Sequence, residues 1–213
     1  MKKIMLTAVF FIGLSLVTSS MSFAVDTKTF TLSANIPAAT GTAINAFSVN
    51  AQGTPIFTAV TGLDLSFNPM IFVTTNGINI WLPNHFFVVD LAPVGGAGSA
   101  NATFTYMEGA NPNTPGHGLG WKSTATFIKV TGANGSQTET GIATHGPKKL
   151  LKDLNGETIL TTDFTGGFLR IYIGVVTKDP AATFQDPPTA EVFSNADHSG
   201  NYDGQLLISA TIP

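Results

Sequence analysis

Cysteine is missing from the 213 residues of this chain. Its absence excludes a disulfide framework, so packing and hydrogen bonding must supply the stability of the fold. Thiolate catalysis and cysteine-ligated metal sites are excluded for the same reason.

Charged residues are also scarce, at 11% of the chain. Without the two lysines near the N-terminus, 8 basic residues face 13 acidic ones, which gives a formal net charge of −5. A mildly acidic chain with scattered lysines has no electrostatic footprint for nucleic acid or for anionic lipid. We therefore expect no nucleic-acid partner.

Long apolar runs are absent apart from one near the start. Residues 1–24 have a basic beginning, an apolar run over residues 4–17 and small residues at Ser22 and Ala24. This pattern is typical of a secretory signal peptide cleaved after Ala24. A membrane anchor is the weaker interpretation, because the run is short compared with a spanning helix of about 20 residues. We expect an exported protein.

The remaining sequence is rich in Thr, Val, Ile, Phe, Gly, Asn and Pro, which favours strands joined by tight turns. Short apolar runs, taken as strands, begin at residues 56, 63, 70, 78, 85, 102, 123, 157, 168 and 202. They predict an all-β protein with one domain over residues 39–213, an immunoglobulin-like antiparallel sandwich. An up-and-down barrel would give much the same pattern.

Local signals add detail to this prediction. Asn76-Gly77 predicts a hairpin between the runs at 70 and 78, since both residues tolerate positive φ. Residues 147–154 are the one helix candidate, opened by Pro147 and closed by Asn155-Gly156. Residues 111–120 and 178–191, with many prolines and glycines, are predicted as long surface loops.

Catalytic and metal-binding patterns are not found. The histidines at 85, 117, 145 and 198 lack short-spaced partners, the glycines at 95–98 lack the Lys-Ser/Thr of a phosphate loop, and residues 197–204 lack the ligand spacing of a calcium loop. We expect no enzyme activity, metal or cofactor. Trp121 could stack on a sugar, but core or rim packing is commoner, and Lys148, Lys149 and Lys152 are expected on a solvated helix face.

The two ends of the exported chain are unusual, because both predict strands with one apolar side. In residues 27–37, apolar residues alternate with polar ones at Phe30, Leu32, Ala34 and Ile36. The tail repeats the pattern at Tyr202, Gly204, Leu206, Ile208, Ala210 and Ile212.

Three segments carry a resemblance to a known family. VDTKTFTLSANIP (25–37), LDLSFNP (63–69) and GNYDGQLLISATI (200–212) are similar to the N-terminal extension, an early strand and the closing strand of the major subunits of colonization-factor fimbriae, the alpha group of chaperone-usher pilins. Such pilins fold as an incomplete sandwich. A chaperone, and then the extension of the next subunit, fills the open groove.

The resemblance implies roles for both ends of this chain. Residues 25–38 would be a donor strand whose plugs are Phe30, Leu32, Ala34 and Ile36, with Ala38 a weak fifth. The groove edge and chaperone contact would comprise Tyr202, Gly204, Leu206, Ile208, Ala210, Ile212 and Pro213, the last through its terminal carboxylate.

The implied partners are identical subunits in a head-to-tail filament, a periplasmic chaperone, an outer-membrane usher, and a tip adhesin and host glycans at the cell surface. A shaft subunit is favoured over a tip adhesin, because the length leaves no room for a second, receptor-binding domain. The alternative is a stand-alone secreted β-sandwich that binds carbohydrate or matrix and pairs its first strand within its own chain.

Overall fold

A computed structural model describes residues 31–35, 42–75, 77–93, 101–112, 117–131, 140–144, 146–159 and 167–211. In these residues the chain is mostly β, with antiparallel sheets and almost no helix, which confirms the all-β prediction. Residues 1–24, predicted as a signal peptide, lie outside the described residues, and so does all of the predicted extension 25–38 except residues 31–35. No helix in the described part of the chain is long and apolar enough to cross a membrane.

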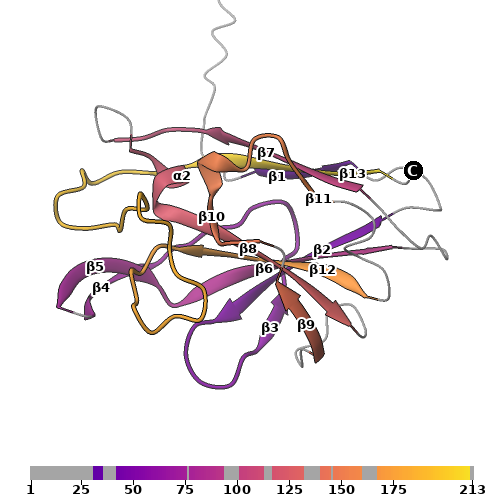
Figure 1. Ribbon diagram of the computed structural model, residues 1–213. Helices are drawn as coiled ribbons and strands as arrows, with labels where there is room; N and C mark the ends of the chain where they lie inside the picture. Colours follow the sequence, from indigo (N-terminus) through magenta and orange to yellow (C-terminus); the bar gives the residue numbers. More distant parts are fainter. Residues whose placement is uncertain are drawn as a thin grey trace, which may run out of the picture.

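The elements follow one another as a series of short strands (Figure 1). Their bounds are β1 Thr31–Asn35, β2 Thr42–Asn50, β3 Phe57–Ala59, β4 Met70–Thr75, β5 Ile78–Pro83, β6 His85–Pro93, β7 Asn101–Glu108, α2 Leu119–Lys122, β8 Ser123–Thr131, β9 Thr140–Thr144, β10 Lys149–Leu150, the 3-10 helix η1 Leu151–Asp153, β11 Glu157–Ile159, β12 Phe168–Val175 and β13 Gly204–Thr211.

The strands form two large sheets and a hairpin. One sheet has the order β1-β13-β7-β11, the other has the order β10-β8-β12-β6-β2-β3 with β9 beside β8, and β4 pairs with β5 alone. In Figure 1 the first sheet lies above the second. Every pairing between described strands is antiparallel except that of β1 with β13, which is parallel.

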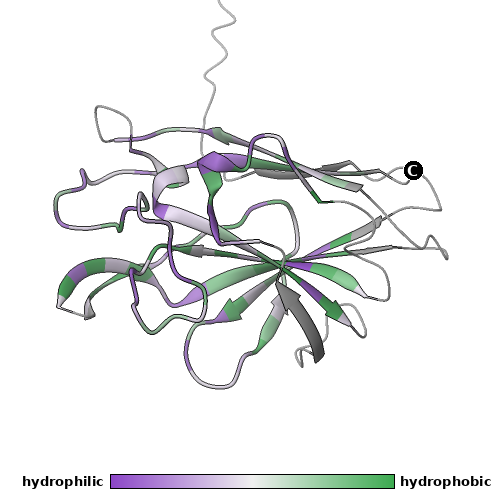
Figure 2. Ribbon diagram, viewed as in Figure 1, coloured by the Kyte–Doolittle hydropathy of each residue, from purple (hydrophilic) through white to green (hydrophobic). Residues whose placement is uncertain are grey.

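The main hydrophobic core takes residues from both large sheets. Alternate positions of each strand supply it: Phe87, Val89 and Leu91 from β6, Leu169, Ile171 and Ile173 from β12, Ala102, Phe104 and Tyr106 from β7, and Leu206, Ile208 and Ala210 from β13. Hydropathy alternates along several of these strands in Figure 2. The two-residue period of a strand therefore places one apolar side of each sheet in a common core.

The opposite side of the larger sheet holds a buried ion pair that the sequence did not reveal. Arg170 in β12 donates from Nε and Nη2 to the two carboxylate oxygens of Asp90 in β6, at 2.8 Å each, and neither side chain is exposed to solvent. The guanidinium lies 4.8 Å from the ring centroid of Phe57 and 5.2 Å from that of Phe168. Residues Asp90 and Arg170 are direct partners across the two strands.

Three local predictions are corrected by the structure. Residues 147–154 do not form an α-helix but the two-residue strand β10 and the 3-10 turn η1, whose leucines pack into the core. Residues 63–67 are not a strand, although Leu65 and Phe67 are buried. The end of the segment 111–120 enters the one-turn helix α2, whose Leu119 belongs to the core. In each case tertiary packing outweighs the local signal.

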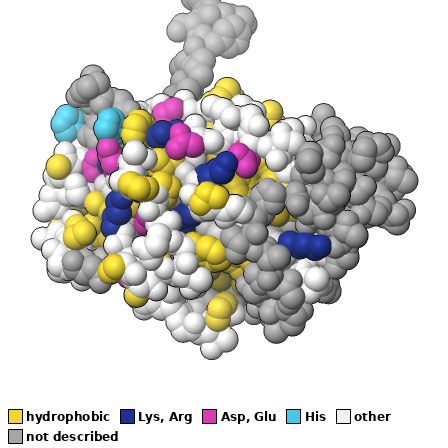
Figure 3. Space-filling view, in the orientation of Figure 1, with side chains coloured by type: hydrophobic (Ala, Val, Ile, Leu, Met, Phe, Trp, Pro, Cys, Tyr) yellow, Lys and Arg dark blue, Asp and Glu magenta, His cyan; other side chains and the backbone are white. Residues whose placement is uncertain are grey.

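The lysines expected on a solvated helix face have specific partners instead. Lys148 Nζ lies 2.8 Å from Asp186, Lys149 pairs with Glu157, and Lys152 lies over the ring of Trp121. Basic and acidic side chains accordingly lie next to each other on the face shown in Figure 3.

The Asn76-Gly77 hairpin prediction is confirmed. Strands β4 and β5 pair from Met70↔Pro83 to Thr75↔Ile78, and Gly77 has φ of +74°. On one side of the hairpin the rings of Phe72 and Trp81 lie 5.0 Å apart, and both are partly exposed. A main-chain hydrogen bond joins the hairpin to the segment before β13: Trp81 N–H donates to Phe193 O at 2.8 Å.

Candidate strand-pairing site

Strand β13 has its apolar side in the core along its whole length, as the tail sequence predicted. Leu206, Ile208 and Ala210 are buried, and each is paired with a buried residue of β7, whereas Leu207 on the other side is 37% exposed. Because direct partners in a sheet share a face, β7 and β13 present one continuous apolar surface to the core.

Strand β1 lies along the other side of β13. Its five residues run parallel to β13 in the register Thr31↔Gln205, Leu32↔Leu206, Ser33↔Leu207, Ala34↔Ile208 and Asn35↔Ser209. Of the five proposed plugs, Leu32 and Ala34 are thus paired with the core residues Leu206 and Ile208. Phe30, Ile36 and Ala38 lie outside the described residues, as do Ile212 and Pro213 at the end of the tail.

This arrangement makes β1 an edge strand among the described residues. It pairs with β13 and with no other strand there, while β13 lies between β1 and β7. Removing β1 would leave one backbone edge of β13 without its ladder partners, next to the buried residues Leu206 and Ile208. An open edge over a hydrophobic core readily accepts another strand.

The start of β13 is shaped by close packing against β7. An added Cβ at Gly204 would lie 2.2 Å from Tyr106 Oη, so a glycine is needed where β13 passes this ring. At Gly120 in α2, an added Cβ would lie 2.6 Å from the same ring and 2.8 Å from Glu108 Oε2. Glycines of two separate segments therefore leave room for the Tyr106 and Glu108 side chains.

Hydrogen bonds link this pair to α2. Tyr106 donates its hydroxyl proton to Glu108 Oε1 at 2.9 Å, and Gly120 N–H donates to Glu108 Oε2 at 3.0 Å. Burial raises the pKa of Tyr106 above its ordinary value, and the neighbouring Glu108 carboxylate raises it further. Removal of water also raises the pKa of Glu108, although both hydrogen bonds oppose this shift.

Tyr202 was predicted in the last strand but lies just before it. Its ring packs against Phe193 at 5.0 Å, and its hydroxyl donates to the carbonyl oxygen of His198 at 3.0 Å. Main-chain bonds from Gly109 N–H to Asp203 O and from Asp203 N–H to Ala110 O continue the β7–β13 contact beyond the strand ends.

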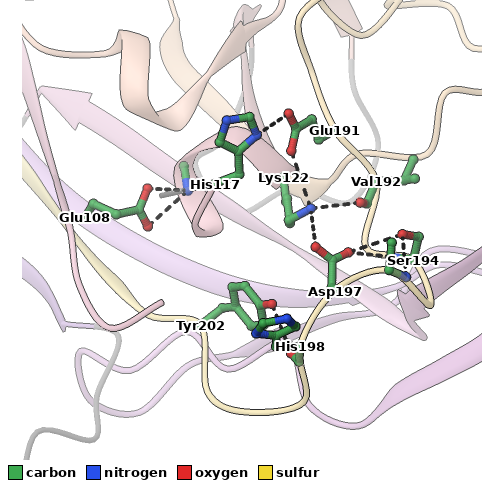
Figure 4. A network of polar contacts seen from close by, with 11 residues as sticks. Glu108, His117, Lys122, Glu191, Val192, Ser194, Asp197, His198 and Tyr202 are labelled. Carbon is green, nitrogen blue, oxygen red and sulfur yellow. Dashed lines mark hydrogen bonds and ion pairs between the residues drawn. The ribbon is translucent and has the colours of Figure 1, made fainter. Parts of the chain in front are cut away.

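A second polar network joins α2 to residues 191–197, and sequence reasoning missed it (Figure 4). Lys122, with 3% of its side chain exposed, lies 2.8 Å from Asp197 and 3.6 Å from Glu191, and it donates to Val192 O at 3.0 Å. His117 Nδ1 also contacts Glu191. These contacts hold the segment before β13 in place, because a buried ammonium needs such partners.

Trp121 does not present a free ring. It stacks on His117 with 4.7 Å between ring centroids and an interplanar angle of 4°, and Lys152 Nζ lies 4.2 Å from its centroid. These contacts agree with rim packing rather than with an empty sugar platform.

The other histidines are engaged with backbone or side-chain oxygens. His85 contacts Asn84 Oδ1 at 2.8 Å and Ser66 O at 2.9 Å, and His198 contacts Pro112 O at 3.0 Å. His145 lies outside the described residues. Within the described part of the chain, no group of three or more His, Asp or Glu side chains could hold a metal ion.

Comparison with known proteins gives no relative. No protein-family model matches this chain, and no curated protein and no solved structure is significantly similar to it.

Proposed function

We propose that this chain is a structural subunit of a surface fimbria that polymerises by donor-strand exchange. One observation carries the proposal: the N-terminal strand β1 is an edge strand paired with the last strand β13, in register with its buried residues Leu206 and Ile208. Cleavage after Ala24 would leave this edge strand close to a free chain end with one connection to the rest of the fold, and another copy could then supply it.

We propose further that the fold is an immunoglobulin-like sandwich that a donor strand completes. At ~1.5–3 kcal/mol for each large side chain buried, Phe30, Leu32 and Ile36 of a donor would contribute roughly 5–9 kcal/mol before backbone hydrogen bonds are counted. Because the donor and the groove are different surfaces, the contact does not close on itself and generates a filament. A periplasmic chaperone and an usher would guard the groove until the next subunit arrives.

A second candidate function has its own support. Strand β1 pairs with β13 of its own chain, which is what a stand-alone secreted binding protein would do. The same pairing is expected of a lone pilin subunit whose extension occupies its own groove. The two functions differ in whether the strand can be exchanged.

Strand exchange is tested with a truncated protein and a synthetic peptide. A variant without residues 25–36, expressed with its chaperone, is expected to form no detergent-resistant, heat-sensitive ladders, whereas the wild type forms them. A peptide of residues 25–38 should bind the truncated protein and raise its melting temperature, because it restores the partner of β13.

The register supplies a matched pair of control peptides. Leu32→Asp replaces the residue paired with buried Leu206 and is expected to abolish the rescue. Ser33→Asp replaces the residue paired with half-exposed Leu207 and should rescue almost as well as the wild-type peptide. Ladders that persist without residues 25–36 would refute the fimbrial proposal. A wild-type protein that stays monomeric and never takes up labelled peptide would support the stand-alone function.

A further inference from the structure

We infer that the outer side of the larger sheet binds a small amphipathic molecule, with an apolar body and one oxygen-bearing head group. The site is a hollow of about 560 Å³ between that sheet and the segment after β12. It lies on the side away from the main core and does not involve β1 or β13, so it is independent of the proposed strand exchange.

Three strands provide the floor of the hollow. Thr124 and Thr126 come from β8, Tyr172 from β12 and Phe86 from β6. In the register of β8 and β12, Thr126 is opposite Tyr172 and Thr124 is opposite Gly174, which has no side chain to fill the space above it. The rings of Phe86 and Tyr172 lie 5.8 Å apart. The floor thus combines two aromatic rings with two threonine side chains.

The wall is formed by the segment that follows β12, coloured light orange to gold in Figure 1. Phe184 of this segment lines the hollow. Asp186 fixes the segment: it accepts hydrogen bonds from the N–H groups of Thr177 at 3.1 Å and Lys178 at 2.8 Å, and it pairs with Lys148 at 2.8 Å. These bonds are made within the protein, so the hollow exists before any ligand binds.

The length of this segment also points to a function. Residues 176–203 contain neither helix nor strand. Connections of more than about 12–15 residues without secondary structure are uncommon in compact domains and are often functional. A connection that builds the wall of a preformed, largely apolar hollow fits this pattern. The volume is within the range of roughly 300–1,000 Å³ that is typical of small-molecule sites.

The lining defines the class of ligand. The rings of Phe86, Tyr172 and Phe184 suit an apolar body. The hydroxyls of Thr124 and Thr126 suit a head group that accepts or donates hydrogen bonds. The lysine on the rim, Lys148, already has a carboxylate partner, so a strongly charged ligand is not required for electrostatic balance. A fatty-acyl chain and a fused-ring compound both meet this description.

The probe that tests the site is 1-anilinonaphthalene-8-sulfonate, which has an apolar ring system and one oxygen-bearing head group. We expect the full chain to bind one probe molecule per chain, with enhanced probe fluorescence. Gly174→Leu should weaken binding by roughly tenfold or more, because the new side chain occupies the hollow. The position can accept a side chain, since an added Cβ first meets Phe86 Cβ at 3.8 Å. Displacement by dodecanoate or by cholate identifies a chain or a fused ring as the preferred body.

The exposed β4–β5 hairpin provides the matched control. Phe72→Ser removes an exposed ring outside the hollow, and it should leave probe binding unchanged. Three results would overturn the inference. Gly174→Leu could bind the probe as tightly as the wild type, Phe72→Ser alone could lose binding, or the wild type could show no saturable binding. If Gly174→Leu does not fold, Phe184→Ala serves instead: a several-fold loss of affinity supports the site, and unchanged affinity overturns it.

Discussion

The buried pair of Asp90 and Arg170 offers the most demanding test of the packing described above. Both side chains have no solvent exposure, and two bonds of 2.8 Å join them. Asp90→Ala would leave the guanidinium buried without its carboxylate. Removing one partner of a buried ion pair costs about 3–5 kcal/mol, a large part of the 5–15 kcal/mol of free energy that stabilises a typical domain.

The expected change is large enough to measure in two ways. In urea unfolding, Asp90→Ala should lose about 3–5 kcal/mol of unfolding free energy. For a domain of 150–250 residues this corresponds to a melting temperature lower by roughly 6–20 °C.

A double variant separates the energetic effect of the ion pair from that of side-chain packing. Asp90→Leu combined with Arg170→Met removes both charges and keeps apolar volume beside Phe57 and Phe168, so it should be more stable than Asp90→Ala. If Asp90→Ala loses less than about 1 kcal/mol, the pair is not desolvated and the reasoning is wrong. The same conclusion follows if the double variant is less stable than the single one.

Three further predictions concern the packing around β13. Gly204→Ala should lose about 1–3 kcal/mol of unfolding free energy, because its Cβ would lie 2.2 Å from Tyr106 Oη. Gly174→Ala should lose much less, because its Cβ would lie 3.8 Å from the nearest atom. Equal losses of stability in thermal melts would contradict this prediction. Tyr106→Phe should lower the unfolding free energy at neutral pH. The difference from wild type should shrink above about pH 10, because the unfolded wild-type chain then releases a phenol proton that the folded protein keeps. A difference in unfolding free energy that does not change with pH in urea titrations would argue against the raised pKa. Lys122→Met should cost about 3 kcal/mol and increase proteolysis near Asp197, and a variant as protease-resistant as the wild type would show that this buried ion pair does not hold the segment.

Much of the fold could be predicted because the relevant signals are local. The hairpin at Asn76-Gly77 needs a turn that accepts positive φ between two apolar runs, and both features lie within a dozen residues. The apolar side of β13 follows from the two-residue period alone, which put Leu206, Ile208 and Ala210 on one face.

Other features were missed because the local sequence favoured a different structure or carried no recognisable pattern. Strand β2 was not predicted, since TAINAFSVN has no strong apolar run. The burial of Asp90 was not predicted, because its partner Arg170 is 80 residues away in the sequence and only the pairing of β6 with β12 brings the two side chains together. Residues 147–154 carry helix-start and helix-stop signals, but burial of Leu150, Leu151 and Leu154 in the interior favours a short strand and a 3-10 turn instead.

For the strand-pairing site, the sequence by itself determined that residues 27–37 and the tail both carry an alternating apolar pattern, and it predicted that one face of the tail is buried. Tertiary structure alone decided that residues 31–35 lie beside β13, that the two strands run parallel, and that Leu32 is paired with Leu206. The periodicity of a strand fixes which of its faces is apolar, because that depends on neighbours along the chain. The partner of each strand and the direction of pairing depend on how all the strands compete for the same edge of the core. The pairing is therefore decided only when the whole chain folds.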